Sequence, residues 1–322
     1  MEDLSFYVAL ESKENKISDI NMAKIKKIEV ELNETQIPFT NEYIDIYLFS
    51  DNKQECITYI NNLDEDIQKY FQIKQIGSNL SYTAFIDILG FSNHINNIDN
   101  IFEAEEFYEK FKLITNYIES EENDNSEIFQ KNKIQYSWIS DTFVIKIEYL
   151  DDTKELKKEV NIRSLLVARL SLIISSIHHY MITEFGLIVR GGISSKLSYI
   201  RNNFLIGQGI VEASKLEKDI ASDPRVIFEK SIINNLDVES LNNYILKDSD
   251  DYYFINYLEM LKTMPPMIGL ISKYSKISAE KMILKTISKY EKVIENGLHT
   301  ENTKIQAKYK WLNNYYSNIF KG

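Results

Sequence analysis

The sequence predicts an α+β protein in which a mixed β-sheet packs against helices. Strand-like and helix-like segments alternate through the middle of the chain, and one pair of strands there is joined by a short hairpin. Of 322 residues, 44% are hydrophobic and 12% aromatic, whereas only 10 are glycine and 4 proline. This composition supplies enough apolar side chains for a substantial core.

The middle zone, residues 79–235, defines the expected topology. The order strand, helix, two hairpin strands, helix and strand is that of a ferredoxin-like sandwich, also called a palm, with its helices on one face of the sheet. A further helix and strand follow. The expected elements are strand 82–88, helix 99–121, strands 133–139 and 142–149, helix 161–184, strand 186–193, helix 209–221 and strand 225–229.

The two outer zones differ in texture from the middle one. Residues 1–78 are expected to form a small accessory α/β region, and residues 236–322 a mostly helical C-terminal region. The expected elements of these zones are strands 6–10, 27–32 and 43–49, a polar helix 54–71, strand 252–258, and helices 278–296 and 301–320.

Charge and cysteine content restrict the function. The net charge of 37 − 48 = −11 disfavours general nucleic-acid binding, which requires a basic surface. The single cysteine, Cys56, allows no internal disulfide and is typical of a reducing compartment. The start, MEDLSF, does not resemble a signal peptide, and the apolar run 165–182 contains Arg169, which indicates a core helix. We therefore expect a cytoplasmic protein without a membrane span.

Two aspartates lie where predicted strands end. Asp87 interrupts an apolar strand, and a buried carboxylate requires hydrogen bonds, a cationic partner or a metal ion. Asp141 lies with Ser140 at the tip of the hairpin. In a ferredoxin-like sheet the first strand and the hairpin are neighbours, so we expect the two carboxylates side by side. Paired Mg²⁺ or Mn²⁺ ions prefer such hard oxygen donors. A role as turn former or helix cap is equally open for each aspartate.

The residues after Asp87 form a candidate phosphate-binding turn. The backbone N–H groups of Ile88, Leu89, Gly90 and Phe91 can face phosphate oxygens, and Gly90 allows a close backbone approach.

Four segments in order resemble the motifs of the class III nucleotidyl cyclases, the adenylate and guanylate cyclase family. The resemblance extends over about 150 of the 322 residues and does not cover 1–78. The segments are AFIDILGF (84–91), SDTFVI (140–145), LIVRGGIS (187–194) and GQGIVEASKLEKDIA (207–221).

This resemblance implies an activity and an assembly. Asp87 and Asp141 match the two metal-binding aspartates of the family, which hold two Mg²⁺ or Mn²⁺ ions. The implied reaction converts a nucleoside triphosphate to a 3′,5′-cyclic nucleotide and pyrophosphate. Sites of this family form at a head-to-tail interface, so the resemblance also implies a homodimer.

The sequence departs from the family at several positions. Val211 replaces the ribose-binding Asn, and Lys215 replaces the catalytic Arg without its bidentate fork. The base-selecting positions fall on Ser137 and Phe204, which suit neither adenine nor guanine. The chain resembles in this respect the bacterial Pycsar pyrimidine cyclases, which implies a cytidine or uridine triphosphate substrate and a role in anti-phage signalling.

Arg190 and Lys215 are the candidate catalytic cations. Arg190 is expected either to neutralise the triphosphate or to form an internal ion pair with a carboxylate at the end of the sheet. Lys215 is expected either to act on the substrate or to form a surface salt bridge with Glu212.

Two other functions stay open on the sequence alone. A catalytically degenerate cyclase fold would serve as a nucleotide-sensing or scaffold module. A palm-type synthase would use the same aspartate pair to join two nucleotides.

Overall fold

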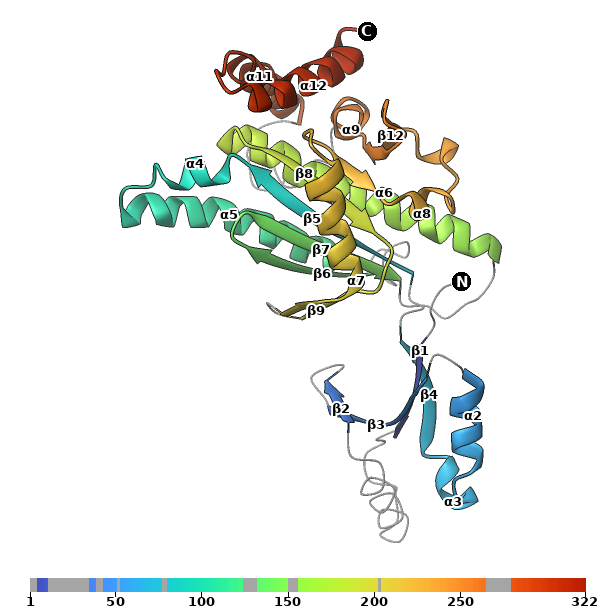
Figure 1. The fold of residues 1–322 in the computed structure, drawn as a ribbon. Coiled ribbons are helices and arrows are strands. Elements are labelled where there is room, and N and C mark those ends of the chain that lie inside the picture. The colour runs from blue at the N-terminus through green and yellow to red at the C-terminus, as the bar shows by residue number, and fades with distance from the viewer. Residues whose placement is uncertain are drawn as a thin grey trace. The chain divides into compact units, whose positions relative to one another are not determined.

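The computed structural model describes residues 5–10, 35–38, 43–50, 53–76, 80–123, 132–149, 156–201, 204–264 and 279–322. The chain divides into two compact units, Met1–Asn79 and Leu80–Gly322 (Figure 1). The strand expected at 27–32 lies outside the described residues.

The first unit contains an antiparallel sheet in the order β2-β3-β1-β4. The prediction of a single helix at 54–71 is wrong. This segment forms two helices, and Phe71 begins the last strand of the sheet. The elements are β1 (Ser5–Leu10), β2 (Thr35–Pro38), β3 (Tyr43–Ser50), α2 (Lys53–Asn61), α3 (Glu65–Gln68) and β4 (Phe71–Ile76).

The second unit is built on a mixed sheet in the order β12-β13-β11-β8-β5-β7-β6. All neighbouring strands are antiparallel except β11 and β8, which are parallel. The predicted α+β class with a mixed sheet is confirmed. The strands are β5 (Ser81–Leu89), β6 (Asn132–Ile139), β7 (Thr142–Tyr149), β8 (Ile188–Ser194), β11 (Val226–Phe228), β12 (Ile245–Lys247) and β13 (Tyr253–Ile255).

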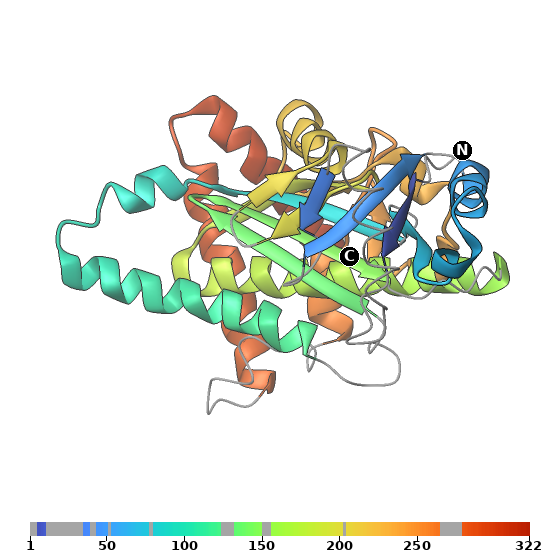
Figure 2. The same ribbon diagram turned by 90° about the horizontal axis from the view of Figure 1, so that it is seen from below.

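Helices cover both faces of this sheet, so the expectation of helices on one face is wrong. Figure 2 shows α5 (Ile101–Glu122) and α6 (Leu156–Tyr180) on one side and α7 (Gln208–Lys215) on the other. Close approach of α7 depends on Gly192 in β8, because a Cβ there would lie 2.3 Å from the carbonyl oxygen of Ala213. A short helix, α4 (Phe91–Ile95), precedes α5, and a separate hairpin consists of β9 (Tyr199–Arg201) and β10 (Phe204–Ile206).

The core lies between the sheet and α6. Successive side chains of a strand point to opposite faces, and the even-numbered residues of β5 are all buried in the same cluster as the apolar side chains of α6. The segment Ile162–Phe185 is long and apolar enough to cross a membrane, but 83% of its most apolar window is buried inside the second unit. This supports the expectation of a core helix. The buried residues are Tyr82, Ala84, Ile86 and Ile88 of β5 and Leu166, Leu170, Ile173 and Ile177 of α6.

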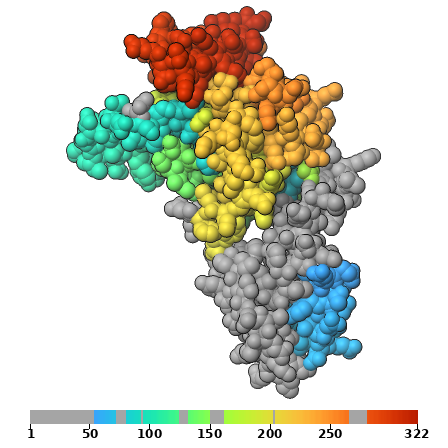
Figure 3. Space-filling view, viewed as in Figure 1, coloured from blue at the N-terminus to red at the C-terminus, as the bar shows by residue number. Residues whose placement is uncertain are grey.

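Residues 236–322 contribute to this same sheet and core. Their strands β12 and β13 extend the sheet, and Tyr290, Leu312 and Tyr315 join the core cluster. The strand expected at 252–258 is shorter, because α9 begins at Tyr257. In the space-filling view, the C-terminal helices lie directly against residues 204–264 (Figure 3). The remaining elements are η1 (Met181–Phe185), η2 (Leu216–Ile220), α8 (Lys230–Ile233), η3 (Glu239–Leu241), α9 (Tyr257–Thr263), α11 (Ala279–Leu298) and α12 (Thr303–Phe320).

Ser140 provides a test of the hairpin, because it has a φ of 58° in the left-handed region. We expect Ser140→Val to lower the free energy of unfolding by about 1–3 kcal/mol, since a β-branched residue is strained there. Ser140→Gly should change it by less than about 1 kcal/mol. Urea denaturation of both variants checks this, and equal effects would contradict the assigned turn.

Candidate functional site

Asp87 and the Ser140–Asp141 turn lie at the same end of the sheet. Asp87 is opposite Thr142 in the β5–β7 ladder, and the backbone N–H of Ile88 donates to the Asp141 carbonyl oxygen at 3.0 Å. The strand end that carries one carboxylate is thus hydrogen-bonded to the turn that carries the other.

Asp87 and Glu217 share one cationic partner, Arg190. Arg190 is directly opposite Asp87 in the β5–β8 ladder, and its Nε donates to Asp87 Oδ2 at 3.0 Å. Arg190 Nη2 lies 2.6 Å from Glu217 Oε1. The internal ion pair expected as one alternative for Arg190 is therefore present, and its second partner, Glu217, was not predicted.

Glu217 reaches the site from a π-helical turn, η2 (Leu216–Ile220), that continues α7. The N–H of Ala221 donates to the carbonyl oxygen of Leu216 at 2.8 Å, a bond to the fifth residue back instead of the fourth. Within this turn Glu217 is buried, whereas Lys215 at the end of α7 is exposed.

Burial is the largest influence on Glu217 and raises the pKa of its carboxyl above the usual value; the charge of Asp87 also raises it, and Arg190 opposes both. Lys308 on α12 is close enough for electrostatic interaction with this group. Burial and the charge of Arg190 lower the pKa of Lys308, whereas Asp87, Asp223 and Glu217 raise it. A side chain of the C-terminal helix therefore takes part in the charge balance around Asp87.

The aspartate pair fits a hard divalent cation in donor type. Mg²⁺ is commonly held by one or two carboxylates, with water and substrate phosphates as the other ligands. Among the described residues, no group of three His, Cys, Asp or Glu side chains is placed to bind a metal ion. Protein side chains alone therefore do not complete the coordination of a metal ion in the described part of the chain. Asp87 and Asp141 would hold the ion, and Arg190 already occupies one oxygen of Asp87.

The predicted phosphate-binding turn is only partly available to a ligand. The N–H of Ile88 is already bonded to the Asp141 carbonyl oxygen. The ring of Phe91 packs edge-on against two phenylalanine rings of α5 at 5.8 Å, which fixes its side chain and not its backbone N–H. Leu89 is half-buried and pairs with β8. Gly90 is exposed, and its φ of 85° begins the short helix α4.

The other predicted site residues are dispersed. Ser137 lies buried on β6, and its hydroxyl has no hydrogen-bond partner in the described part of the chain. Phe204 is exposed on the separate β9–β10 hairpin. On α7, Val211 is exposed and the Lys215 ammonium lies 3.0 Å from the Glu212 carboxylate, the surface salt bridge expected as one alternative.

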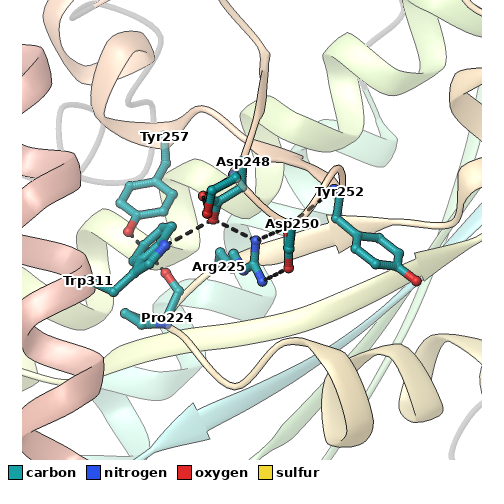
Figure 4. Close-up of polar contacts among 8 residues, drawn as sticks. Pro224, Arg225, Asp248, Asp250, Tyr252, Tyr257 and Trp311 are labelled. Atoms are coloured by element: carbon teal, nitrogen blue, oxygen red, sulfur yellow. Dashed lines mark hydrogen bonds and ion pairs between the residues drawn. The ribbon is translucent and has the colours of Figure 1, made fainter.

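A second ionic cluster is centred on Arg225 (Figure 4). Arg225, which is buried, donates to Asp248 at 2.6 Å and to both carboxylate oxygens of Asp250. The indole Nε1 of Trp311 in α12 donates to Asp248 at 2.9 Å. The carbonyl of Arg225 accepts from the N–H of Gly191 at 3.1 Å. The cluster thus connects the C-terminal helix to the strand that carries Arg190.

Sequence reasoning missed Glu217 and Lys308. It predicted an acidic partner for Arg225 but not that the partners are Asp248 and Asp250. Glu217 lies in the segment that resembles the late cyclase helix, so its position was a usable signal. Lys308 had none, because its proximity to Asp87 depends on how α12 packs.

Comparisons with known proteins do not assign this chain to a family. No family model and no curated protein matches the chain. Two structures of a bacterial light-regulated adenylyl cyclase are similar to it at 10% identity and a TM-score of 0.30, over 90% and 89% of this chain and 99% of each of those chains. A TM-score this low identifies neither fold nor function.

The Arg225 cluster should be important for stability. We expect Arg225→Met to lower the free energy of unfolding by about 3 kcal/mol, because it leaves Asp248 without its cation in a largely buried position. The matched control is Lys247→Met, which removes the exposed pair with Asp251 and should cost less than about 1 kcal/mol. Thermal and urea unfolding of both variants test this, and similar losses would contradict it.

Proposed function

We propose that the unit Leu80–Gly322 is a metal-dependent nucleotidyl cyclase. The observation that carries the proposal is the juxtaposition of Asp87 with the Asp141 turn on adjacent strands. The strand order β8-β5-β7-β6, formed in the chain order strand, helices, hairpin, helix and strand, supports a palm arrangement. In that arrangement these two strand ends face a nucleoside triphosphate.

The chain's own residues would bind and orient the substrate. Asp87 and Asp141 would hold two divalent cations, which when bound would neutralise phosphate charge and make the 3′-hydroxyl more acidic. The 3′-hydroxyl gives its proton to water and its oxygen bonds to the α-phosphorus. The bond from that phosphorus to the bridging oxygen breaks, and pyrophosphate leaves. The protein contributes mainly alignment and charge neutralisation. Lys215 would meet the negative charge that develops at the α-phosphate.

We further propose that the substrate carries a pyrimidine base and that the protein acts as a homodimer. Ser137 and Phe204 at the base-selecting positions carry no charge, and the buried Ser137 hydroxyl has a hydrogen bond still to make. Exposed apolar side chains at Ile139, Val211 and Phe204 are consistent with a partner chain completing the site. The anti-phage role stays a prediction from the resemblance alone.

The direct test is turnover with each of the four ribonucleoside triphosphates and Mn²⁺, measured as pyrophosphate release and product mass. We expect a product lighter than its substrate by pyrophosphate, with a pyrimidine base. Asp87→Asn and Asp141→Asn should each lower the rate by about 100-fold or more, because they weaken electrostatic stabilisation at the reacting phosphate. Asp219→Asn, a change at an exposed acid of η2, is the control and should retain the rate.

The outcomes separate the alternatives. A linked dinucleotide in the product would favour the palm-type synthase. Binding of nucleotide without turnover would favour the sensing or scaffold module, which the Arg190–Asp87 ion pair and the loss of the ribose-binding Asn at Val211 also support.

Lys215 gives a second test of the catalytic assignment. If it meets developing charge, Lys215→Gln should lower kcat by about tenfold with little change in KM, since the interaction is made mainly in the transition state. Lys218→Gln changes an exposed lysine in the next helical turn and should leave both constants unchanged. Steady-state kinetics of the two variants check this. Equal behaviour would assign Lys215 to the Glu212 salt bridge alone.

A further inference from the structure

A pocket of about 490 Å³ lies where the end of η1 meets α11 and α12. Two glycines shape it. The φ of 67° at Gly186 turns the chain from η1 toward β8, and a Cβ on Gly297 would lie 2.1 Å from the Tyr309 ring, so α11 and α12 can approach closely there. Small-molecule sites usually have volumes of roughly 300–1,000 Å³. The pocket therefore has room for a small organic ligand, and none of the residues that line it belongs to the candidate cyclase site.

Two lysines give the pocket a positive charge. Lys289 and Lys292 are three residues apart on α11, which places both on one face of the helix. Neither ammonium has an ion-pair partner among the described residues. Of the described residues that line the pocket, Glu184 alone is acidic, and it is paired with Lys285 at 3.2 Å. The lining thus carries two cationic charges that are free to meet an anion.

The lining combines hydrogen-bonding groups with apolar surface. Asn296 of α11 and Tyr309 of α12 contribute side chains that make no hydrogen bond within the described residues. Burial raises the pKa of Tyr309, so its hydroxyl stays protonated at neutral pH and can donate. Apolar surface comes from Phe185, Val293 and Ile305. A ligand that matches this lining has both an anionic group and an apolar body.

A phosphate monoester matches the charge of the two lysines better than a carboxylate does. It carries a charge of about −1.5 to −2 at pH 7 and offers three acceptor oxygens, whereas a carboxylate brings a single charge. Lysine binds phosphate as a point charge, without the fixed fork of arginine. The Asp87 and Asp141 carboxylates, in contrast, repel an anion as long as no divalent cation is bound beside them. The two sites are therefore distinguishable by their need for metal.

We propose that the pocket between η1, α11 and α12 binds an organic phosphate monoester. Its phosphate pairs with Lys289 and Lys292. Its apolar body packs on Phe185, Val293 and Ile305. Binding requires no metal ion, and it does not depend on the proposed cyclase activity. The bound ligand connects η1 with the C-terminal helices, because its contacts come from elements that are far apart in the sequence.

The test uses the full chain in the presence of EDTA, with phenyl phosphate as the probe and affinity measured by NMR titration. Phenyl phosphate should bind saturably. It should bind about tenfold more tightly than benzoate, which has the same ring with a single charge, and than inorganic phosphate, which lacks the ring. Equal affinity for either comparator would contradict recognition of both groups. Absence of saturable binding would overturn the site.

Matched variants assign the contacts. Lys289→Gln and Lys292→Gln should each weaken phenyl phosphate binding about tenfold, because a charged donor to the phosphate is lost. Lys281→Gln removes an exposed lysine of the same helix that does not line the pocket, and it should leave the affinity unchanged. Equal effects of the three changes would assign binding to the general charge of α11 and overturn the proposal. Ile305→Ser should weaken phenyl phosphate about threefold without affecting inorganic phosphate; an equal effect on both would contradict the apolar contact.

The unaltered protein supplies a measurement that does not depend on a variant's folding. In a ¹H–¹⁵N spectrum, phenyl phosphate should shift the backbone signals of Gly186, Gly297 and Thr300, which line the pocket. Shifts confined to the Gly90 turn would assign the anion to the proposed cyclase site and overturn the inference. Binding of the expected form together with no nucleotide turnover would support the pocket and contradict the cyclase. Turnover without phenyl phosphate binding would support the cyclase and contradict the pocket.

Discussion

Strand β5 is hydrogen-bonded along both edges, and the geometry of the second unit depends on this double pairing. Its partners β7 and β8 fix which residues stand beside Asp87, namely Thr142 on one side and Arg190 on the other. The even-numbered side chains of β5 enter the core, so the odd-numbered ones must face α7. A carboxylate at position 87 is therefore held at the covered face of the sheet, where it has to be compensated.

Compensation takes the form of two adjoining charge clusters, and their arrangement connects distant parts of the chain. Arg190 balances Asp87 and Glu217, and Arg225 balances Asp248 and Asp250. The backbone bond between Gly191 and Arg225 joins the two. Because Trp311 bonds to Asp248 and Lys308 interacts with Asp87, α12 contributes to the environment of the site although it is far along the sequence. The surroundings of the site thus include residues outside the segment that resembles a cyclase.

The pattern of apolar residues along the sequence was sufficient to predict the helices and strands that have a regular hydrophobic period. The hairpin 132–149 and the long core helix were predictable because alternating and continuous apolar runs specify them. The adjacency of Asp87 and the Asp141 turn followed from the expected strand order. Tertiary contacts explain what was missed. The packing of α7 on the opposite face requires a small residue at Gly192, a requirement that local pattern does not reveal. The short strand β12 is exposed at two of its three residues, so little in its sequence indicates a strand. The sequence also did not indicate which charged residues pair with each other, since Arg190 could have paired with any nearby acid.

The π-helical turn after α7 makes the site sensitive to chain length as well as to residue type. One additional residue in that turn moves everything after it by about 100° around the helix axis relative to an ordinary α-helix. Loss of Leu216 alone would restore the regular spacing and rotate Glu217 and the side chains after it, without changing any charge or removing any acid. Related chains that differ here by one position would keep the same set of ionisable groups yet turn Glu217 away from Arg190. An insertion or deletion could thus alter the chemistry of this surface while composition and fold stay the same.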